Sequence, residues 1–453
     1  MPSTDLDLTH LTGCIRVPKR HHPVGRIVSV SAASVTLSGL AEVARLGDRV
    51  HLLGPQKLSA DIFEISGDCV SALTDGPANG LRVGQRMRLA EQADLSVDDS
   101  WLGRIVDPYG VALDGDPLMA GPVAHPLVTA PPPPATRRAL GDRLETGLRV
   151  FNTFLPIARG QRLGLFAGSG VGKSTLLGTL CRQVDADVVV IGLVGERGRE
   201  LRHFIEDVLG PDGMARAVIV AATSDMDAQR RKRCALSAMT VAEHFRDQGR
   251  QVLLVIDSIT RLAEAHRETA TAAGEAANLR GYPPSTAHML TSLCERAGPG
   301  AGEQGDITAI FSVLVAGSDM EEPVADMLRG VLDGHVVLDR EIAERGRYPA
   351  IDLLRSVSRC LPAAASEEEN DLLTRARARL AVYERSEMMV QAGLYSAGTD
   401  PSIDEAMATF QDLDAFIAAR EEDSLNTSFV ALKRLLDLAA RKGKLTANHP
   451  TPL

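Results

Sequence analysis

Aromatic residues are scarce in this 453-residue chain: they make up 4% of it, and there is one tryptophan. Proteins that bind single-stranded nucleic acid stack the bases on aromatic side chains, and duplex-binding proteins are usually basic. This chain carries 49 basic and 59 acidic residues, a formal net charge of −10. Its composition therefore argues against a general nucleic-acid-binding protein, although it leaves room for a local basic groove.

Cysteine is also sparse, and its spacing excludes the usual cysteine motifs. The six cysteines lie at residues 14, 69, 181, 234, 294 and 360, too far apart for a CxxC metal or redox site. Scattered thiols are typical of a reducing compartment, where they behave as small apolar side chains. The eleven histidines show no HExxH spacing, so no zinc site is expected.

Long apolar runs are absent as well. No stretch reaches the roughly 20 residues that span a bilayer. The first residues, MPSTDLDLTHLTG, are acidic and polar, unlike a secretory signal. We therefore expect a cytoplasmic protein that associates with a membrane only peripherally, through partners.

Three kinds of sequence follow one another along the chain. Residues 23–95 consist of short alternating runs broken by Gly, Asp and Ser, typical of a small β-barrel. Residues 96–365 alternate apolar runs, such as DVVVIGLVG and QVLLVIDS, with helix-like stretches, which predicts an α/β domain with a buried parallel sheet. Within them, APPPPATRR at 130–138 is expected to be a stiff linker. Residues 366–453, rich in Ala, Leu, Glu and Arg, predict a helical domain.

The most specific local signal is the stretch GLFAGSGVGKSTL, residues 164–176. Backbone N–H groups in such a glycine-rich loop, with the positive end of the helix that follows, form a cradle for phosphates. Lys173 reaches the outer phosphates, and the Ser174 hydroxyl is placed to bind Mg²⁺. Ala167 stands where the strict pattern has glycine, and we count it as a tolerated variant. The expected ATP-binding residues of the loop are Gly168, Ser169, Gly170, Val171, Gly172, Lys173, Ser174 and Thr175.

Two further strand ends carry carboxylates that suit ATP chemistry. The run LLVIDS ends in Asp257, which either holds the Mg²⁺ shell or is an ordinary turn or helix-cap residue; the upstream loop favours the metal role. The run GLVGERGRE carries Glu196, which either orients the attacking water or belongs to a solvated charge cluster. The residues alone leave these two interpretations of Glu196 equally open.

Seven short motifs, in this order along the chain, resemble those of the catalytic-subunit family of rotary ATPases: AGSGVGKST, GERGRE, VIDSITR, GYPPS, LDGHVVL, GRYPAID and SVSR. Within that family the chain resembles the flagellum-specific export ATPases of type III secretion, on GERGRE, ERGRYPAIDLLRSVSR and GLYSAGTDPSIDEA. The resemblance runs from about residue 23 to about residue 425. It implies an N-terminal β-barrel, a RecA-like P-loop NTPase core and a C-terminal helical domain, with residues 1–22 as a regulatory segment.

The resemblance also implies roles for single residues. Glu196 matches the catalytic glutamate, and Arg197 matches an arginine near the phosphates. Tyr348 matches the aromatic that packs on adenine, which suits a flat apolar face; the alternative is an ordinary core tyrosine. Arg359 matches an arginine finger that reaches the adjacent subunit's nucleotide, where a guanidinium suits the charge of a transferring phosphoryl group. The alternative for Arg359 is a structural salt bridge.

The implied function is hydrolysis of ATP, with Mg²⁺, to energise protein export through a flagellar type III apparatus. Sites shared between subunits imply a homohexameric ring. The family's partners are export-gate and stalk proteins, a dimeric regulator and chaperone–cargo complexes, without nucleic acid. The alternatives are the injectisome counterpart, a rotary ATP synthase catalytic subunit, a non-catalytic nucleotide-binding subunit and a ring RNA translocase. The sequence leaves the cargo and the share of the proton-motive force open.

Two segments invite a separate prediction. Within residues 262–288, two alanines follow Gly274 and Glu275 where flagellar relatives have two prolines. We expect this loss of proline to loosen the loop and to affect contacts with other subunits or cargo, while leaving the nucleotide chemistry unchanged. The basic run RRKR at 230–233 is expected to be a polar helix face or a subunit contact, in preference to a nucleic-acid patch.

Overall fold

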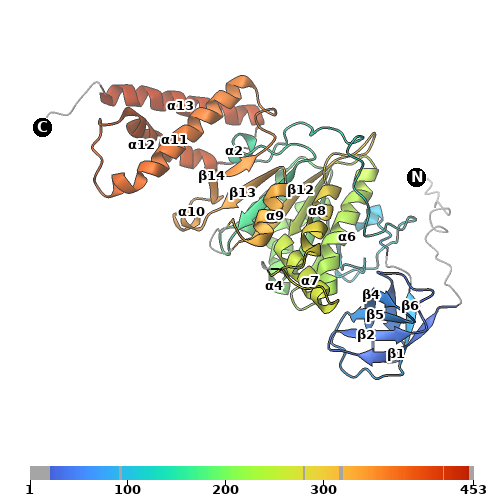
Figure 1. Ribbon diagram of the computed structural model, residues 1–453. Helices are drawn as coiled ribbons and strands as arrows, with labels where there is room; N and C mark the ends of the chain where they lie inside the picture. Colours follow the sequence, from blue (N-terminus) through green and yellow to red (C-terminus); the bar gives the residue numbers. More distant parts are fainter. Residues whose placement is uncertain (1–20, 91–93, 279–280, 316–319, 422, 448–453) are drawn as a thin grey trace, which may run out of the picture.

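Three bodies follow one another along the molecule: a barrel, a central α/β domain and a helical domain (Figure 1). The expected N-terminal regulatory segment lies outside the described part of the chain except for its last two residues. The computed structural model describes residues 21–90, 94–278, 281–315, 320–421 and 423–447.

The N-terminal body is a closed barrel with the strand order β1-β2-β5-β4-β3-β6. Alternate side chains point inward, as the period of a strand requires: Val35 and Leu37 of β2 are buried, and their neighbours are half-exposed. The predicted barrel is thus confirmed. Its strands are β1 (Val24–Val30), β2 (Ser34–Ser38), β3 (Arg49–Leu52), β4 (Ser59–Ser66), β5 (Cys69–Thr74) and β6 (Arg86–Ala90).

The central domain is built on an eight-stranded sheet of order β14-β13-β8-β12-β11-β9-β10-β7. Every neighbouring pair is parallel except β13 and β14. Both faces are covered, which is why these strands read as continuous apolar runs. The strands are β7 (Ile105–Val106), β8 (Arg162–Ala167), β9 (Val188–Glu196), β10 (Ala217–Thr223), β11 (Val252–Asp257), β12 (Ile307–Leu314), β13 (Gly334–Leu338) and β14 (Ile351–Ser358).

Helices cover the sheet from both sides (Figure 1). Side chains of β8 pack into hydrophobic cores on both faces of the sheet. Leu163 and Leu165 belong to the core around α3, and Phe166 belongs to the core around α6 to α9. The helical elements are η1 (Asp99–Trp101), α2 (Arg149–Asn152), α3 (Lys173–Gln183), α4 (Gly198–His203), the π-helical turn η2 (Phe204–Leu209), α5 (Gly210–Ala215), α6 (Ala228–Asp247), α7 (Ile259–Ala272), α8 (Ser285–Arg296), α9 (Pro323–Val331) and α10 (Arg340–Glu344).

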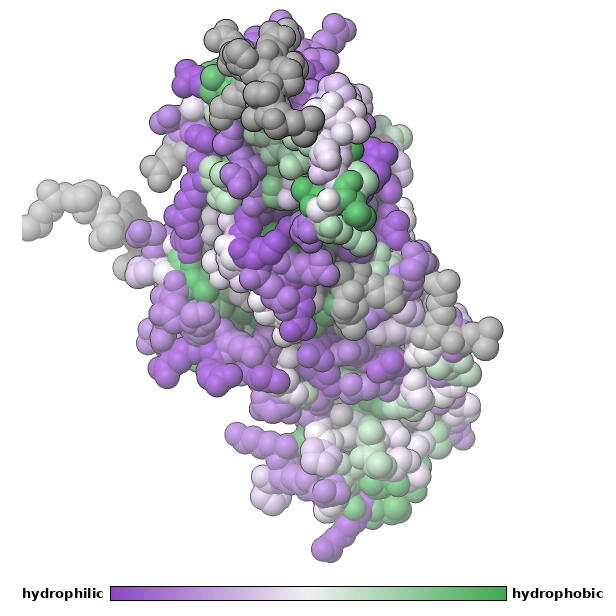
Figure 2. All heavy atoms as spheres, turned by 90° about the vertical axis from the view of Figure 1, so that its left-hand side faces the viewer, coloured by the Kyte–Doolittle hydropathy of each residue, from purple (hydrophilic) through white to green (hydrophobic). Residues whose placement is uncertain are grey.

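The C-terminal body consists of α11 (Glu367–Gln391), α12 (Pro401–Ala418) and α13 (Leu425–Ala447). Helix α11 begins with a capping box between Ser366 and Glu369. Phe416 of α12 meets Phe154 edge to face, with ring centroids 6.1 Å apart, so the helical domain shares a core with the central domain. In the described part of the chain, no helix is long and apolar enough to cross a bilayer. The face in Figure 2 is mostly hydrophilic, with apolar side chains in small groups.

The basic run at residues 230–233 lies at the start of α6 and joins the barrel to the central domain. Arg230 lies 3.6 Å from Asp75 of the barrel and 3.4 Å from Asp227, which caps α6. Arg231 pairs with Glu268 of α7 at 2.8 Å. These contacts occur within one chain, so the run acts as an internal joint; whether it also touches another subunit stays a prediction.

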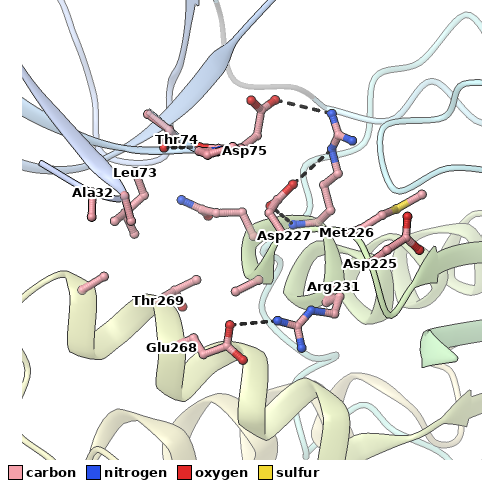
Figure 3. A pocket seen from close by; sticks show the side chains of 17 residues that line it. Ala32, Leu73, Thr74, Asp75, Asp225, Met226, Asp227, Arg231, Glu268 and Thr269 are labelled. Carbon is pink, nitrogen blue, oxygen red and sulfur yellow. Dashed lines mark hydrogen bonds and ion pairs between the residues drawn. The ribbon is translucent and has the colours of Figure 1, made fainter. Parts of the chain in front are cut away.

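A pocket of about 600 Å³ lies beside this joint, between the barrel and helices α6 and α7 (Figure 3). Leu73 and Asp75 of the barrel line one side, and Asp227, Arg231 and Glu268 line the other. None of the lining residues belongs to the predicted ATP site.

Candidate active site

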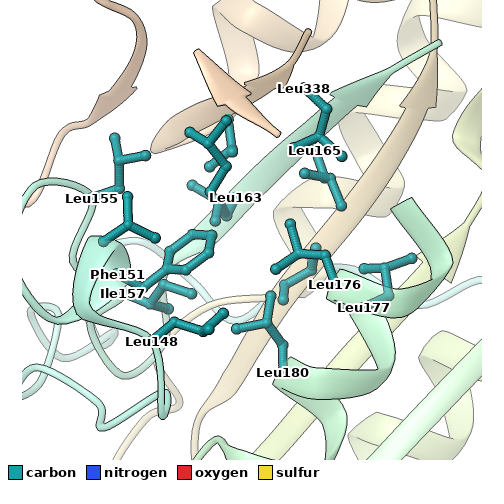
Figure 4. Packing of buried hydrophobic residues seen from close by; sticks show 14 of the residues in the cluster. Leu148, Phe151, Leu155, Ile157, Leu163, Leu165, Leu176, Leu177, Leu180 and Leu338 are labelled. Atoms are coloured by element: carbon teal, nitrogen blue, oxygen red, sulfur yellow. The ribbon is translucent and has the colours of Figure 1, made fainter. Parts of the chain in front are cut away.

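The glycine-rich loop connects the end of β8 to the start of α3, as predicted. Its strand and helix are fixed by a shared core in which Leu163 and Leu165 face Leu176 and Leu180 (Figure 4). This packing aims the N-terminus of α3, with its four free N–H groups, at the loop. The N-terminus of a helix with such a loop is an anion site.

Two glycines of the loop have backbone conformations that other residues adopt only under strain. Gly170 has φ 80° and Gly172 has φ 85°. On either side of them, Ser169, Ser174 and Thr175 are exposed. The loop therefore presents its backbone and its hydroxyl groups outward, where a phosphate can meet them.

Three charged side chains converge next to this loop. The Lys173 ammonium pairs with Asp257 Oδ1 and lies 4.0 Å from Glu196 Oε1. The carboxylates come from β11 and β9, which are parallel neighbours and end at the same edge of the sheet. Asp257 is 3% exposed, and the cap of α7 is Ser258, so the helix-cap interpretation of Asp257 is wrong.

Burial gives Glu196 an unusual proton affinity. It raises the pKa of Glu196 to about 7; the charge of Asp257 and a hydrogen bond with Glu200 act in the same direction, and Lys173 opposes them. Arg197 turns away: its side chain is 73% exposed and pairs with Glu200, while the Glu196 side chain is only 22% exposed. Glu196 is thus more buried than Arg197, although a hydrogen bond joins it to Glu200, and it carries a proton affinity suited to a group that accepts a proton at neutral pH.

Ser312 of β12 belongs to the same group of residues, and sequence reasoning missed it. Its side chain is fully buried, and its hydroxyl donates a hydrogen bond to Asp257 Oδ1. Strand β12 lies between β8 and β11, so it reaches the site from between the loop and Asp257. The available signal was a polar residue inside the apolar run AIFSVLV, which needs a partner when buried.

The donor set fits Mg²⁺. One ammonium and two carboxylates leave the cluster negative, and Ser174 adds an exposed hydroxyl at the start of α3. Magnesium usually takes one or two carboxylates and completes its shell with water and phosphate oxygens. Among the described residues no group of three or more His, Cys, Asp or Glu is arranged to hold a metal, so the ion would share its shell with the triphosphate.

Tyr348 lies over the glycine-rich loop. A Cβ atom added to Gly172 would lie 3.1 Å from Tyr348 Cδ1, and the tyrosine is 51% exposed. The alternative of an ordinary core tyrosine is therefore wrong. An exposed aromatic face beside a phosphate loop is available for stacking.

Arg359 lies at the opposite edge of the sheet from the loop. It follows Ser358, the last residue of β14, which is paired with Gly334 of β13; the next residue of β13, His335, is paired with Gly164 near the start of β8. The loop follows the other end of β8. The Arg359 guanidinium donates a hydrogen bond to the Arg329 carbonyl at 3.0 Å, at the end of the sheet opposite the glycine-rich loop.

Known proteins resemble this chain over almost its whole length. The ATP synthase alpha/beta family, nucleotide-binding domain, matches residues 147–358, and the T3SS EscN ATPase C-terminal domain matches residues 365–434. The flagellum-specific ATP synthase of Caulobacter vibrioides is 42% identical, covering 91% of this chain and 95% of the relative. That of Pseudomonas aeruginosa is 39% identical, covering 94% and 96%. The assembled ATPase EscN of enteropathogenic E. coli superposes with a TM-score of 0.85 at 35% identity, covering 91% of this chain and 100% of EscN.

Proposed function

This chain belongs to the type III secretion ATPases of the ATP synthase alpha/beta family, and from that premise we propose that it hydrolyses Mg-ATP to energise the export of flagellar proteins. The observation that carries the proposal is the convergence of Lys173, Asp257 and Glu196 beside an anion-binding loop. ATP hydrolysis needs these groups: a lysine for the phosphates, a carboxylate for the metal shell and a second carboxylate for the attacking water.

Each residue has one task in this proposal. The loop amides and Lys173 bind the β- and γ-phosphates, so Lys173 leaves Asp257 when ATP arrives. Ser174 and Asp257 would hold Mg²⁺, which would supply positive charge to neutralise the phosphate oxygens. Glu196 orients the attacking water and accepts its proton, Arg197 lies at the rim of the phosphate site, and the Tyr348 ring supports the adenine.

Arg359 serves a neighbouring copy. Its place at the far edge of the sheet supports a role in trans, where it stabilises the transferring phosphoryl group of the adjacent subunit. Head-to-tail contacts of this kind close into a ring, which we propose has six members. EscN has been solved as an assembled ATPase and with its central stalk EscO. We propose a stalk protein as a partner here too, with an export gate, a dimeric regulator and chaperone–cargo complexes, at the cytoplasmic face of the membrane.

The injectisome counterpart is the second candidate. It is supported by the match to the EscN C-terminal domain and by the EscN structures at 35% identity. The flagellar assignment is preferred because flagellum-specific relatives reach 42–44% identity. Restoration of swimming and of hook-protein secretion in a flagellar ATPase deletion strain tests the preference, and failure there with rescue of an injectisome strain would reverse it.

Replacement of Glu196 by Gln tests the catalytic proposal. The neutral amide keeps the size of the side chain and accepts no proton, so Mg-ATPase turnover should fall by about 10²–10⁴-fold, with ATP affinity preserved. Turnover is measured by phosphate release and affinity by equilibrium binding.

Glu206→Gln is the matched control, because that side chain is 58% exposed and pairs with Arg202 at the surface. It should hydrolyse ATP like the wild type. Retained turnover in Glu196→Gln would remove Glu196 from its proposed role, and absence of ATP hydrolysis by the wild type would remove the proposed function.

A further inference from the structure

Asp257 has two partners with different mobility. Its Oδ1 atom receives the Lys173 ammonium and the Ser312 hydroxyl. Lys173 lies on the loop at the start of α3, and its long side chain is needed at the phosphates when ATP binds. Ser312 is a short side chain, fully buried in the middle of the sheet. Only the serine can stay with Asp257 while the lysine moves.

The register of the sheet fixes this pair. Phe311 of β12 is paired with Ile256 of β11, so Ser312 and Asp257 are the next residues along two parallel neighbours and face the same side. On its other side Ser312 is paired with Leu165 of β8, the strand that carries the loop. Both partners of the hydrogen bond are held by strand backbone, and its geometry does not depend on the loop.

We propose that Ser312 is a positioning residue that holds Asp257 for Mg²⁺ while Lys173 transfers to the phosphates. The inference rests on the proposed function. Asp257 is 3% exposed, and once it loses its lysine its carboxylate would otherwise be free to turn away from the metal position. The hydroxyl donor keeps one carboxylate oxygen tied to the sheet, which leaves the other free for the metal shell.

The test measures how much Mg²⁺ strengthens ADP binding, using a fluorescent ADP with the full-length protein, in Mg²⁺ and in EDTA. In Ser312→Ala, the strengthening by Mg²⁺ should fall about tenfold, with affinity in EDTA unchanged, since residues that orient metal ligands have effects of this size. Steady-state ATPase at fixed low Mg²⁺ should fall by a similar factor and recover as Mg²⁺ is raised. Ser312→Thr keeps the hydroxyl and should restore both.

Ser356→Ala is the matched control. Ser356 is also a fully buried serine of the same sheet, but its hydroxyl bonds the Asp352 carbonyl and the Val337 N–H, away from the site. It should leave the Mg²⁺ effect unchanged, and its melting temperature shows what loss of a buried hydroxyl does to the fold alone.

A Ser312→Ala protein with the full Mg²⁺ effect overturns the inference and leaves the proposed function intact. An equal loss in Ser312→Ala and Ser356→Ala also overturns it, because the role of Ser312 would then be structural. A wild-type protein that binds no ADP in either condition would instead refute the proposed function.

Discussion

At the scale of single residues, Lys173 lies beside two carboxylates at the end of a buried sheet, and these carboxylates have different surroundings. Asp257 is fixed by its hydrogen bonds with Lys173 and Ser312. The pKa of Glu196 is raised to about 7 by burial and by the charge of Asp257. This difference suits one carboxylate to metal binding and the other to proton transfer.

The raised pKa of Glu196 predicts the pH dependence of turnover. The carboxyl is ionised above a pKa of about 7, and only the ionised form accepts a proton, so kcat/KM should fall about tenfold per pH unit below that value. The measurement is kcat/KM for Mg-ATP between about pH 5.5 and about pH 8.5, which covers the falling limb and the plateau. Glu206→Gln should keep the profile, whereas a flat wild-type profile would contradict the assignment.

The same shift predicts a change of stability with pH. Since the folded-state pKa lies above the ordinary value of 4.5, the native protein binds more protons than the unfolded chain between about 4.5 and about 7. The contribution of Glu196 to the free energy of unfolding therefore declines as pH rises through this interval and is constant above it. Glu196→Gln should melt higher relative to wild type at pH 8 than at pH 5. An equal difference in melting temperature between Glu196→Gln and the wild type at both pH values would count against the raised pKa of Glu196.

Sequence reasoning found those site residues whose chemistry is local. Lys173 and Ser174 follow from spacing after a strand, and Asp257 follows from its place at a strand end. Glu196 needed a family resemblance, because a glutamate among charged neighbours has no local signature. Ser312 was missed because its partner is set by the pairing of β12 with β11, which a single sequence does not contain.

At the scale of elements, the joint between barrel and central domain was the main feature that the sequence could not reveal. The barrel and the buried sheet follow from periodicity, but the partners of RRKR come from a barrel strand end and from α7.

The proline-poor loop was expected to be loose. Glu275 there accepts hydrogen bonds from the Ser285 N–H and hydroxyl at 2.9 and 2.6 Å, which ties the loop to the start of α8. Its effect on other subunits stays a prediction.

Arg49 of the barrel also contacts the central domain, through Tyr109. Its side chain is 9% exposed and pairs with Asp61 at 3.1 Å and Asp75 at 2.5 Å, and its guanidinium lies 4.0 Å from the centroid of the Tyr109 ring. Arg49→Ala would leave Asp75 buried without its main partner, which should destabilise the protein by about 3–5 kcal/mol. Urea denaturation followed by fluorescence of Trp101, the only tryptophan, measures the change.

Arg202→Ala removes a guanidinium that is 77% exposed and should shift the same transition by less than about 1 kcal/mol. Equal shifts for the two variants would mean that the buried pairs at the joint contribute no more than a surface pair.

At the scale of the whole molecule, the sheet separates the glycine-rich loop from Arg359, the two parts of the proposed active site. The loop, Glu196 and Tyr348 lie at the edge where β8 ends, and Arg359 lies at the edge where β8 begins. In the proposed mechanism, one copy supplies an incomplete site at each edge, and two copies complete it. Assembly would then control hydrolysis, since an arginine supplied in trans changes rates by about 10³–10⁵-fold.

Mixing two inactive variants tests this central claim most directly. Lys173→Ala copies lack the lysine that binds the phosphates but keep Arg359. Arg359→Ala copies keep that lysine but lack the arginine. Each alone should show almost no Mg-ATPase activity, while an equal mixture assembled together should recover roughly a quarter of the wild-type rate, because a quarter of the interfaces in a random ring join an intact loop to an intact arginine. A mixture no more active than its components, or an Arg359→Ala protein as fast as the wild type, would contradict the account.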